Sequence, residues 1–229
     1  MAEEMLYLKR RFHPQQIWFA DDIFALSAKW TSEFAVAVES LDAAIPFKMQ
    51  SRCDLMTRDV VADLRRAGCS EVWMGAESGS QRILDAMDKG IRVDHIYRAR
   101  EILSRHGIRT GLFLQFGYRG EIWEDIEATV HMVREAKPDD IGVSVSYPMP
   151  GTKFFQLVSS EMNAKANWRD SGDLSMMFRG TYSSEFYRAL ANALHLEVRN
   201  AENRQAIHEA WTRVHQLRSG NGKAVGVAS

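Results

Sequence analysis

Two adjacent carboxylates and a single arginine each follow a short apolar run near the start of the chain. The carboxylates are Asp21 and Asp22, and the arginine is Arg52. Paired carboxylates can hold a cation or an ammonium group, or can shift each other's pKa for acid–base chemistry. A guanidinium can bind a carboxylate through two parallel hydrogen bonds. Structural alternatives exist for both features, because aspartate is a good helix N-cap and Arg52 could pair with Asp54.

Two later apolar runs end in clusters that suit a nucleoside. Glu77 and Ser78 open a Glu-Ser-Gly-Ser cluster, which can hydrogen-bond a ribose diol but is also typical of a turn that caps a helix. Phe116 and Gly117 open a second cluster, which ends at Glu121 and contains two glycines. Glycines let the backbone approach a flat ligand closely. No Gly-Lys-Ser or Gly-Lys-Thr follows, so the second cluster is not a phosphate-binding P-loop.

The elements that must position these residues alternate along the chain. Short apolar runs predict five strands, at residues 17–20, 47–51, 72–76, 111–116 and 141–146. Amphipathic patterns predict helices at residues 3–12, 30–41, 57–68, 81–88, 94–106 and 122–136. Regular alternation of this kind favours a parallel sheet with right-handed crossovers, whose ligands bind at the carboxyl ends of the strands.

Beyond residue 152 the alternation stops. Helical patterns at residues 154–162 and 184–218 predict a C-terminal helical extension. We therefore predict an α/β fold in which residues 1–155 form a partial (β/α) TIM-like barrel and residues 156–218 form the extension. Residues 219–229, which are rich in glycine and small side chains, are predicted to be a flexible tail.

Composition limits the classes of function. The chain has 229 residues, of which 45% are hydrophobic and 26% charged, as expected for one globular core. Its 29 basic and 30 acidic residues give a net charge of -1, which provides no overall electrostatic reason to bind nucleic acid or an anionic membrane. There is no signal-peptide pattern at the start, and no apolar run approaches the ~20 residues that span a bilayer. We expect a cytoplasmic protein that binds a small molecule.

Cysteine usage is sparse. Cys53 and Cys69 are the only two cysteines, and their spacing does not match a zinc site or a disulfide framework. We interpret both as packed thiols, because free cysteine behaves as a small buried hydrophobe.

The order of the motifs is more specific than any one of them. The chain contains, in sequence, FADDIF, SRCD, AGCSEVWMGAESGSQRIL, MDKG, FGYRGE and PMPGT. This series resembles the core of the radical S-adenosylmethionine (SAM) superfamily, in particular the branch whose members often carry an upstream cobalamin-binding domain. The resemblance implies a barrel of six units, of which this chain would supply units two to six.

The resemblance also implies that the first strand ends surround the methionine part of SAM. Asp21 and Asp22 stand in the place of the family's Gly-Gly-Glu motif, which contacts the methionine amino group. Arg52, Glu77 and Ser78 stand where polar side chains meet the methionine carboxylate or the ribose.

For the adenine, the resemblance implies contacts from the last two strand ends. Phe116, Gly117 and Glu121 match the family's Gly-x-Ile-x-Gly-x-x-Glu segment, although Arg119 stands where proline is usual. Pro148 opens a loop braced by two prolines, which would complete the adenine wall but is otherwise typical of a structural turn.

The family's radical chemistry depends on a 4Fe-4S cluster held by a C-x-x-x-C-x-x-C loop, which delivers an electron to SAM and releases a 5′-deoxyadenosyl radical. This chain contains no such loop. We therefore expect a radical SAM core fragment that does not bind the cluster alone and that a second polypeptide, supplying the first barrel unit, could complete. Cobalamin would enter through an upstream domain.

Two other functions are compatible with the sequence. The chain could be a non-catalytic module that binds SAM in the same pocket. Alternatively, Asp21, Asp22 and Glu77 could form a divalent-metal hydrolase site, which needs carboxylates at strand ends and no cysteine. If residues 17–20 form a sheet edge, their unpaired backbone groups should also invite pairing with another chain.

Overall fold

The computed structural model describes residues 1–162 and 174–221, with side chains through residue 219. The described residues form two compact units, and each is considered by itself. Unit 1 comprises Met1–Ala76, Lys89–Phe113 and Val133–Asp140. Unit 2 comprises Glu77–Asp88, Leu114–Met132 and the described residues from Ile141 onward.

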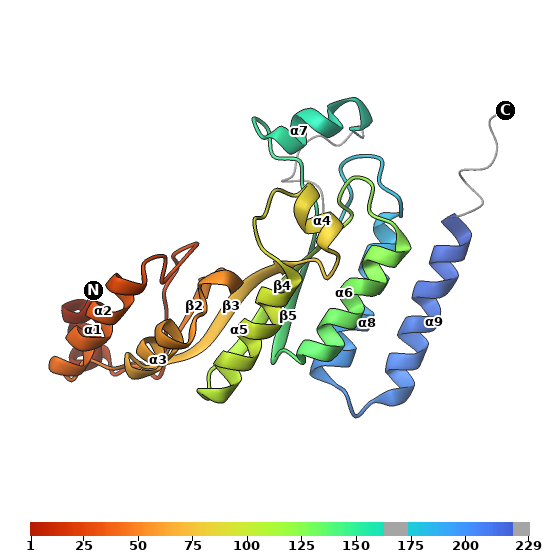
Figure 1. Ribbon diagram of the computed structural model, residues 1–229. Coiled ribbons are helices and arrows are strands. Elements are labelled where there is room, and N and C mark those ends of the chain that lie inside the picture. The colour runs from red at the N-terminus through yellow and green to blue at the C-terminus, as the bar shows by residue number, and fades with distance from the viewer. Residues whose placement is uncertain (163–173, 222–229) are drawn as a thin grey trace. The chain divides into compact units, whose positions relative to one another are not determined.

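Five strands form one sheet with the order β1-β2-β3-β4-β5 (Figure 1). The strands are β1 Ile17–Trp18, β2 Phe47–Ser51, β3 Cys69–Glu77, β4 Arg109–Phe116 and β5 Asp140–Val145. The register places Ile17 beside Phe47 and Met49 beside Val72, both in parallel pairs. The predicted α/β arrangement of parallel strands and crossover helices, that of a partial (β/α) barrel, is confirmed.

One helix precedes the first strand, and the others connect the strands or follow the last one. They are α1 Ala2–Phe12, α2 Ala28–Ser40, η1 Cys53–Leu55, α3 Arg58–Arg66, α4 Gln81–Ala86, α5 Val93–Arg105, α6 Trp123–Ala136, α7 Lys153–Val158, η2 Ser159–Glu161, α8 Ser184–Arg199 and α9 Arg204–Asn221. Helix α3 illustrates how the sequence sets their ends: Thr57 caps it by accepting the Val60 N–H at 3.4 Å. Gly68 ends the turn that follows with φ +102, and a Cβ there would lie 2.9 Å from the Ile45 carbonyl oxygen. Only glycine suits that position.

Each unit has its own buried side chains. In unit 1 the inner faces of α2 and β2 bury Phe34, Val38 and Phe47, and α2 contacts both α1 and α3. In unit 2 helix α8 buries Leu190 and Leu194 and packs along α9. The amphipathic periods that predicted these helices therefore correspond to buried faces.

The first strand is shorter than predicted. The ladder with β2 continues only to the Phe19 N–H, which donates to the Lys48 carbonyl at 3.0 Å, and then resumes at Phe24, whose N–H donates to Gln50 at 2.8 Å. Residues 20–23 bulge out of the ladder between these two bonds. The prediction of a strand over residues 17–20 is therefore corrected to Ile17–Trp18.

The C-terminal helices differ from their prediction in two respects. The helix predicted over residues 154–162 ends at Val158, and the 3-10 helix η2 follows it. The helix predicted over residues 184–218 is two helices, α8 and α9, which lie side by side (Figure 1). Asn200 leaves the helical region with φ -133 and ψ 47, and the Asn203 side chain accepts the Ala206 N–H at 3.1 Å. Asparagine favours such caps and turns over a continuous helix, which explains the break.

The end of the chain was predicted to be a flexible tail from residue 219. Helix α9 continues to Asn221, and residues 222–229 lie outside the described part of the structure. Within the described residues, no helix combines the length and the apolar character needed to cross a membrane.

Candidate functional site

The end of β1 carries its two carboxylates in solvent. Asp21 and Asp22 are exposed, and within the described residues neither side chain takes part in a hydrogen bond or an ion pair. Helix α2 starts at Ala28, and its N-cap is Ser27, which accepts the Trp30 N–H at 3.3 Å. The alternative interpretation of the aspartates as N-caps is therefore wrong.

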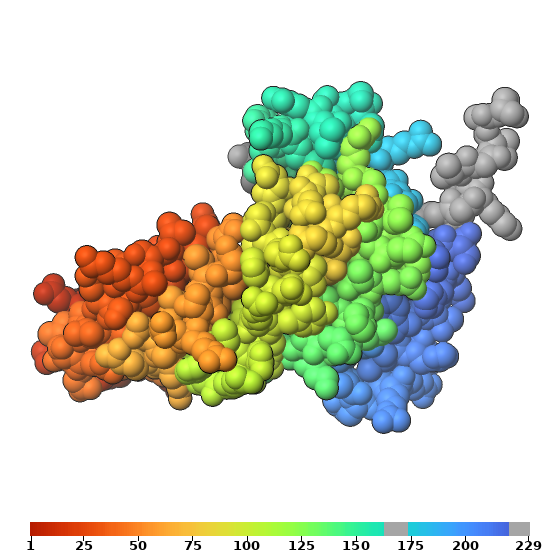
Figure 2. Space-filling model, in the orientation of Figure 1, coloured from red at the N-terminus to blue at the C-terminus, as the bar shows by residue number. Residues whose placement is uncertain are grey.

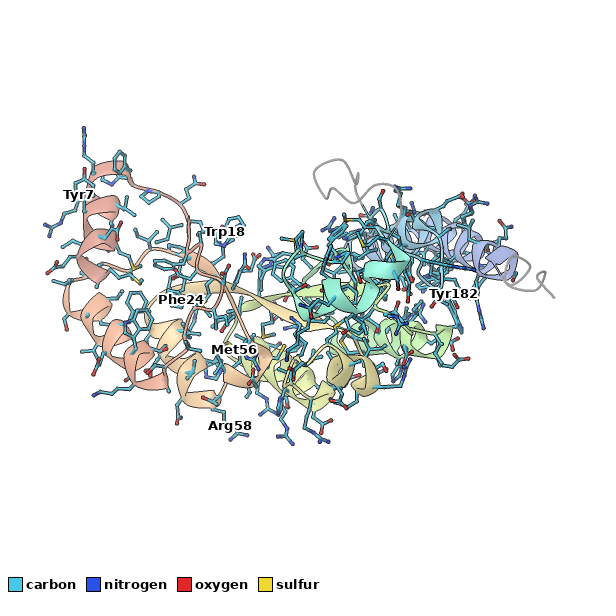
Figure 3. All side chains as sticks on the ribbon, turned by 90° about the horizontal axis from the view of Figure 1, so that it is seen from above. Tyr7, Trp18, Phe24, Met56, Arg58 and Tyr182 are labelled. Atoms are coloured by element: carbon cyan, nitrogen blue, oxygen red, sulfur yellow. The ribbon has the colours of Figure 1, made fainter. Side chains whose placement is uncertain are left out.

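Aromatic side chains fix both ends of the loop that carries these aspartates. The ring of Phe19 stacks on Phe24, with centroids 4.8 Å apart, and Phe24 meets Trp30 edge to face at 5.2 Å. Phe24 is 3% exposed, and Figure 3 shows it among the side chains of unit 1. Residues 20–23 are therefore held at both ends while the two carboxylates between them stay solvated.

Arg52, at the end of β2, forms the structural pair that the sequence left open. Its Nε and Nη2 atoms donate to the two carboxylate oxygens of Asp54 at 3.0 and 3.1 Å. Nη2 also donates to the Lys89 carbonyl at 3.3 Å. A contact between Arg52 and a ligand stays a prediction. The ion pair with Asp54 would orient the guanidinium for that contact.

Glu77 closes β3 in an unusual backbone conformation. Its φ is 58, in the left-handed region, and the residue is only 9% exposed. Residues other than glycine seldom adopt this backbone conformation, and the strain costs of order 1–3 kcal/mol. Such outliers concentrate at binding and catalytic sites, which makes Glu77 the most informative of the predicted site residues.

The residues after Glu77 are fixed to helix α6. The hydroxyl groups of Ser78 and Thr129 lie 3.1 Å apart in hydrogen-bond contact, and Thr129 Oγ1 accepts the Gly79 N–H at 2.9 Å. A Cβ on Gly79 would lie 2.3 Å from the Ala128 carbonyl oxygen, so only glycine permits this approach. Ser78 is fully buried. Its hydroxyl therefore holds the loop in place and is not part of the surface that a ligand would meet.

The segment after β4 closes on itself. The Gly117 N–H donates to Glu121 Oε2 at 2.7 Å, and the Glu121 N–H donates to the Tyr118 carbonyl at 2.9 Å. Gly117 and Gly120 have φ +73 and +81. Two glycines in the left-handed region thus allow a turn that one buried carboxylate holds from inside.

Burial changes the acidity of that carboxylate. Glu121 is fully buried, and desolvation raises its pKa to about 8, although the Gly117 N–H opposes the shift. The nearby Asp125 raises it further, and Arg82 lowers it. The side chain is therefore protonated through most of the neutral range, which limits the cost of burying it.

The last two predicted residues lie beside the end of β4 and after β5. Phe116 is 1% exposed, and its carbonyl accepts the Ser146 N–H at 2.8 Å. Pro148 is buried. The loop that it opens leads to Thr152, which caps α7 by accepting the Phe155 N–H at 3.1 Å.

The sequence did not identify the polar residues of α6 that organise this site. Asp125 accepts the Ser80 hydroxyl at 2.6 Å and forms an ion pair with Arg82, and Arg82 also donates to the Gly120 carbonyl at 2.9 Å. Asp125 and Thr129 are four residues apart, so they share one face of α6. Both are buried. Their polar side chains next to the apolar stripe of α6 were the signal from which the sequence could have identified them.

The cysteines do not suit an iron–sulfur cluster. Cys53 and Cys69 are both buried, and Cys53 Sγ contacts the Gly75 carbonyl at 3.7 Å. Burial raises the pKa of Cys69 to about 12, which disfavours the thiolate that a cluster requires. The sequence has no third cysteine. Its thiols therefore do not fit the family's cluster, and the interpretation of both as packed thiols agrees with their burial.

A metal site made of protein side chains also lacks support. Among the described residues, no group of three histidine, cysteine, aspartate or glutamate side chains is placed to hold a metal ion. The hydrolase alternative, which needs Asp21, Asp22 and Glu77 together, is not supported.

Two of the predicted strand ends remain accessible, and each is considered by itself. Solvated paired carboxylates can bind an ammonium group. A Cβ on Gly120 would find no atom within 4 Å, so the loop after β4 has an open backbone surface there.

Known proteins share both sequence and fold with this chain. A family model for the radical SAM superfamily matches residues 1–133. A protein of Pyrococcus horikoshii, named an uncharacterized methyltransferase, is 27% identical over 171 residues, which cover 74% of this chain and 37% of that protein. The chain thus spans little more than a third of that relative.

Solved structures show the same fold. The radical SAM methyltransferase TsrM of Kitasatospora setae, solved with cobalamin and a 4Fe-4S cluster, matches with a TM-score of 0.56 and 20% identity over 62% of this chain and 29% of its own. Coproporphyrinogen III oxidase of Escherichia coli, a radical SAM enzyme, matches with a TM-score of 0.54 and 16% identity over 65% of this chain and 36% of its own.

The strand-end loops and the five-stranded parallel sheet are thus found in a chain whose first 133 residues match a single family model. Because the match covers more than half of the sequence, this chain belongs to the radical SAM superfamily.

Proposed function

We propose that this chain binds SAM at the carboxyl ends of its strands and forms the SAM-binding core of a radical SAM enzyme. The observation that carries the proposal is Glu77, a buried carboxylate held with φ 58 at the end of β3. A strained residue persists only where the surroundings determine its conformation, and such strain is common where a ligand is held.

Different residues would hold different parts of SAM. Asp21 and Asp22 would accept the methionine ammonium group, and Arg52 would meet the methionine carboxylate. Glu77 would accept hydrogen bonds from the ribose hydroxyls, the groups that its family position faces. These assignments draw on the family resemblance and on the strand-end positions of the residues.

The adenine side would be formed mainly by backbone. Gly117 and the open surface at Gly120 would let the base approach the chain, with Phe116 and Pro148 supplying apolar packing nearby. Glu121 would act from inside by holding the Gly117 turn. Such pre-organisation reduces the entropy lost on binding.

The cluster and cobalamin would come from outside these 229 residues. When bound, the cluster supplies the electron that cleaves SAM. The residues of this chain would orient SAM and exclude water from it. We expect weak SAM affinity for the isolated chain, because in the family the cluster iron chelates the methionine group.

Titration calorimetry of the full chain with SAM tests the proposal. We expect a dissociation constant of roughly 0.1–1 mM, and a loss of about tenfold or more in Glu77→Gln, which corresponds to about 1.4 kcal/mol. Glu127→Gln is a matched control, because Glu127 is an exposed carboxylate on α6. Binding that is unchanged in Glu77→Gln, or no binding at millimolar SAM, would contradict the proposal.

Anaerobic reconstitution with iron and sulfide tests the cofactor assignment separately. We expect no stoichiometric 4Fe-4S cluster, because Cys53 and Cys69 are buried and no third thiol is present. A cluster near one per chain, seen by its visible absorption and iron content, would show that the assignment is wrong. It would also favour an enzyme over a binding module.

We further propose that another βα polypeptide segment pairs with β1. This strand is at one edge of the sheet, and its Ile17 and Phe19 N–H groups point toward β2. In a parallel strand the backbone N–H and C=O groups of the residue between them point away from that neighbour, toward the open edge. Trp18, which is labelled in Figure 3, is that residue, and it is 57% exposed.

Light scattering and hydrogen exchange test this pairing. The isolated chain should self-associate through this edge, and an added βα segment should make it monomeric. A stable monomer with a strongly protected Trp18 amide would exclude the proposed pairing.

A further inference from the structure

The loop after β4, residues 117–121, is held by side chains of α7 and η2. The ring of Tyr118 stacks on Phe154 of α7, with centroids 4.7 Å apart and planes inclined by 18°. At its other end the Tyr118 hydroxyl donates to the Ala86 carbonyl at 2.8 Å. The ring is therefore fixed both by stacking and by its polar tip.

The next residue in the loop is held from the same side. Arg119 Nε donates to Glu161 Oε1 at 2.9 Å, and Arg119 Nη2 lies 2.8 Å from the same oxygen in an ion pair. The side chains of Arg119 and Glu161 are 48% and 27% exposed. Two close contacts from one planar guanidinium restrict its orientation more than a single contact would.

The frame that carries Phe154 and Glu161 is itself anchored in unit 2. Phe154 packs edge to face on Phe178, at 5.5 Å, and Phe178 is 1% exposed. The Glu161 carbonyl accepts the Arg179 N–H at 2.9 Å, and Met162 forms an antiparallel bridge with Phe178. Phe154 and Glu161 are therefore anchored independently of the loop and do not simply move with it.

We propose that Phe154 and Glu161 are positioning residues, which fix Tyr118 and Arg119 so that the loop keeps one conformation for the adenosine part of SAM. Figure 2 shows the α7 segment lying against the surface of this loop. The identity of the ligand rests on the proposed function, whereas the effect on the loop does not.

The magnitudes of these contacts suit such a role. Gly117 and Gly120 give the loop more conformational freedom than other residues would. A stacked aromatic pair and a partly exposed ion pair together correspond to about a tenfold bias toward one conformation. That bias is too small to decide whether the protein folds, but it is large enough to decide how often a five-residue loop is ready to bind.

Two measurements on the full chain test the proposal. Amide hydrogen exchange of Gly117 and Glu121 reports the order of the loop without ligand, because both amides donate hydrogen bonds within it. Calorimetry with S-adenosylhomocysteine reports ligand affinity. The variants are Phe154→Leu, Glu161→Gln and the exchanged pair Arg119→Glu with Glu161→Arg.

We expect Phe154→Leu and Glu161→Gln each to speed exchange at Gly117 and Glu121 by about three- to fivefold and to weaken S-adenosylhomocysteine binding by a similar factor. The exchanged pair should restore most of the protection, because it re-forms the ion pair with opposite polarity. A residue that served only to hold α7 would change neither loop exchange nor affinity.

Glu185→Gln is the matched control, since it removes an exposed ion pair with Arg213 between α8 and α9. It should leave loop exchange and affinity unchanged. Unchanged exchange at Gly117 and Glu121 in both single variants would overturn the proposal. If the unaltered chain binds no S-adenosylhomocysteine, the proposed function fails, and the exchange measurement still decides whether Phe154 and Glu161 position the loop.

Discussion

At the end of β3 the polar groups of Ser78, Gly79 and Thr129 satisfy one another inside the protein, whereas at the end of β1 the carboxylates of Asp21 and Asp22 extend into solvent. The first arrangement keeps its conformation without a ligand, because its hydrogen bonds are internal. The second arrangement avoids the free-energy cost of burying charged groups, but its side chains stay mobile. A ligand at the end of β3 would find a surface already formed, whereas a ligand at the end of β1 would have to order the side chains that bind it.

Among substitutions that test this comparison, Gly79→Ala should cause the largest change in the free energy of unfolding. The new Cβ would lie 2.3 Å from Ala128 O and 2.7 Å from the Thr129 Cα, and backbone atoms cannot move aside cheaply. We expect the free energy of unfolding to fall by about 3 kcal/mol, measured by urea titration. A loss below about 1 kcal/mol would mean that the loop can lift from α6, and the comparison would then fail.

The next effect concerns pH and Glu121. Burial raises the pKa of this carboxyl from its ordinary 4.5 to about 8. Between these values the folded state holds one proton more than the unfolded chain, so the free energy of unfolding should decrease as pH rises and level off above about 8. We expect a loss of about 2 kcal/mol between pH 5 and 8, within the limit of about 1.4 kcal/mol per pH unit.

Glu121→Gln separates this contribution from other titrating groups. The amide can still accept the Gly117 N–H but does not titrate, so the slope between pH 5 and 8 should largely vanish. An equal slope in the variant would assign the pH dependence to another group.

A smaller effect is expected for Thr129→Val. The substitution keeps the shape of the side chain but leaves the Gly79 N–H and the Ser78 hydroxyl without their common partner. We expect a loss of about 1.5 kcal/mol in the free energy of unfolding. Thr212→Val provides the control, because Thr212 is exposed and bonds only to its own helix at His208; a similar loss there would show that the effect is not specific to this loop.

The smallest change should come from the solvated end of β1. Asp22→Asn should alter the free energy of unfolding by less than about 0.5 kcal/mol, because the described structure gives Asp22 no partner to lose. SAM binding should nevertheless weaken in the calorimetric titration. A large change in stability would show that the carboxylate has a structural role after all.

The strands and crossover helices were predictable because the signals that define them are local. Thr57 caps α3 as its position before the helix suggests, and the Arg52–Asp54 pair spans two residues. The break between α8 and α9 was not predicted, since the helical pattern on both sides outweighed two asparagines in the turn.

The interior of the site could not be predicted in the same way. Thr129 meets Gly79 across 50 residues of sequence, and nothing in the helical pattern of α6 identifies that partner. Glu121 was expected near the ligand, yet it is fully buried and bonds to Gly117. Spacing shows that such residues share a region, but only packing decides which of them face inward.

The contacts of Tyr118 and Arg119 with Phe154 and Glu161 cross residue 133, where the match to the family ends. A chimera that joined the first 133 residues of this chain to the C-terminal segment of a relative would separate both pairs. Recombination within the family should therefore exchange the loop after β4 and the segment around α7 together. We expect substitutions at positions 118 and 154, and at 119 and 161, to occur as compensating pairs among homologues.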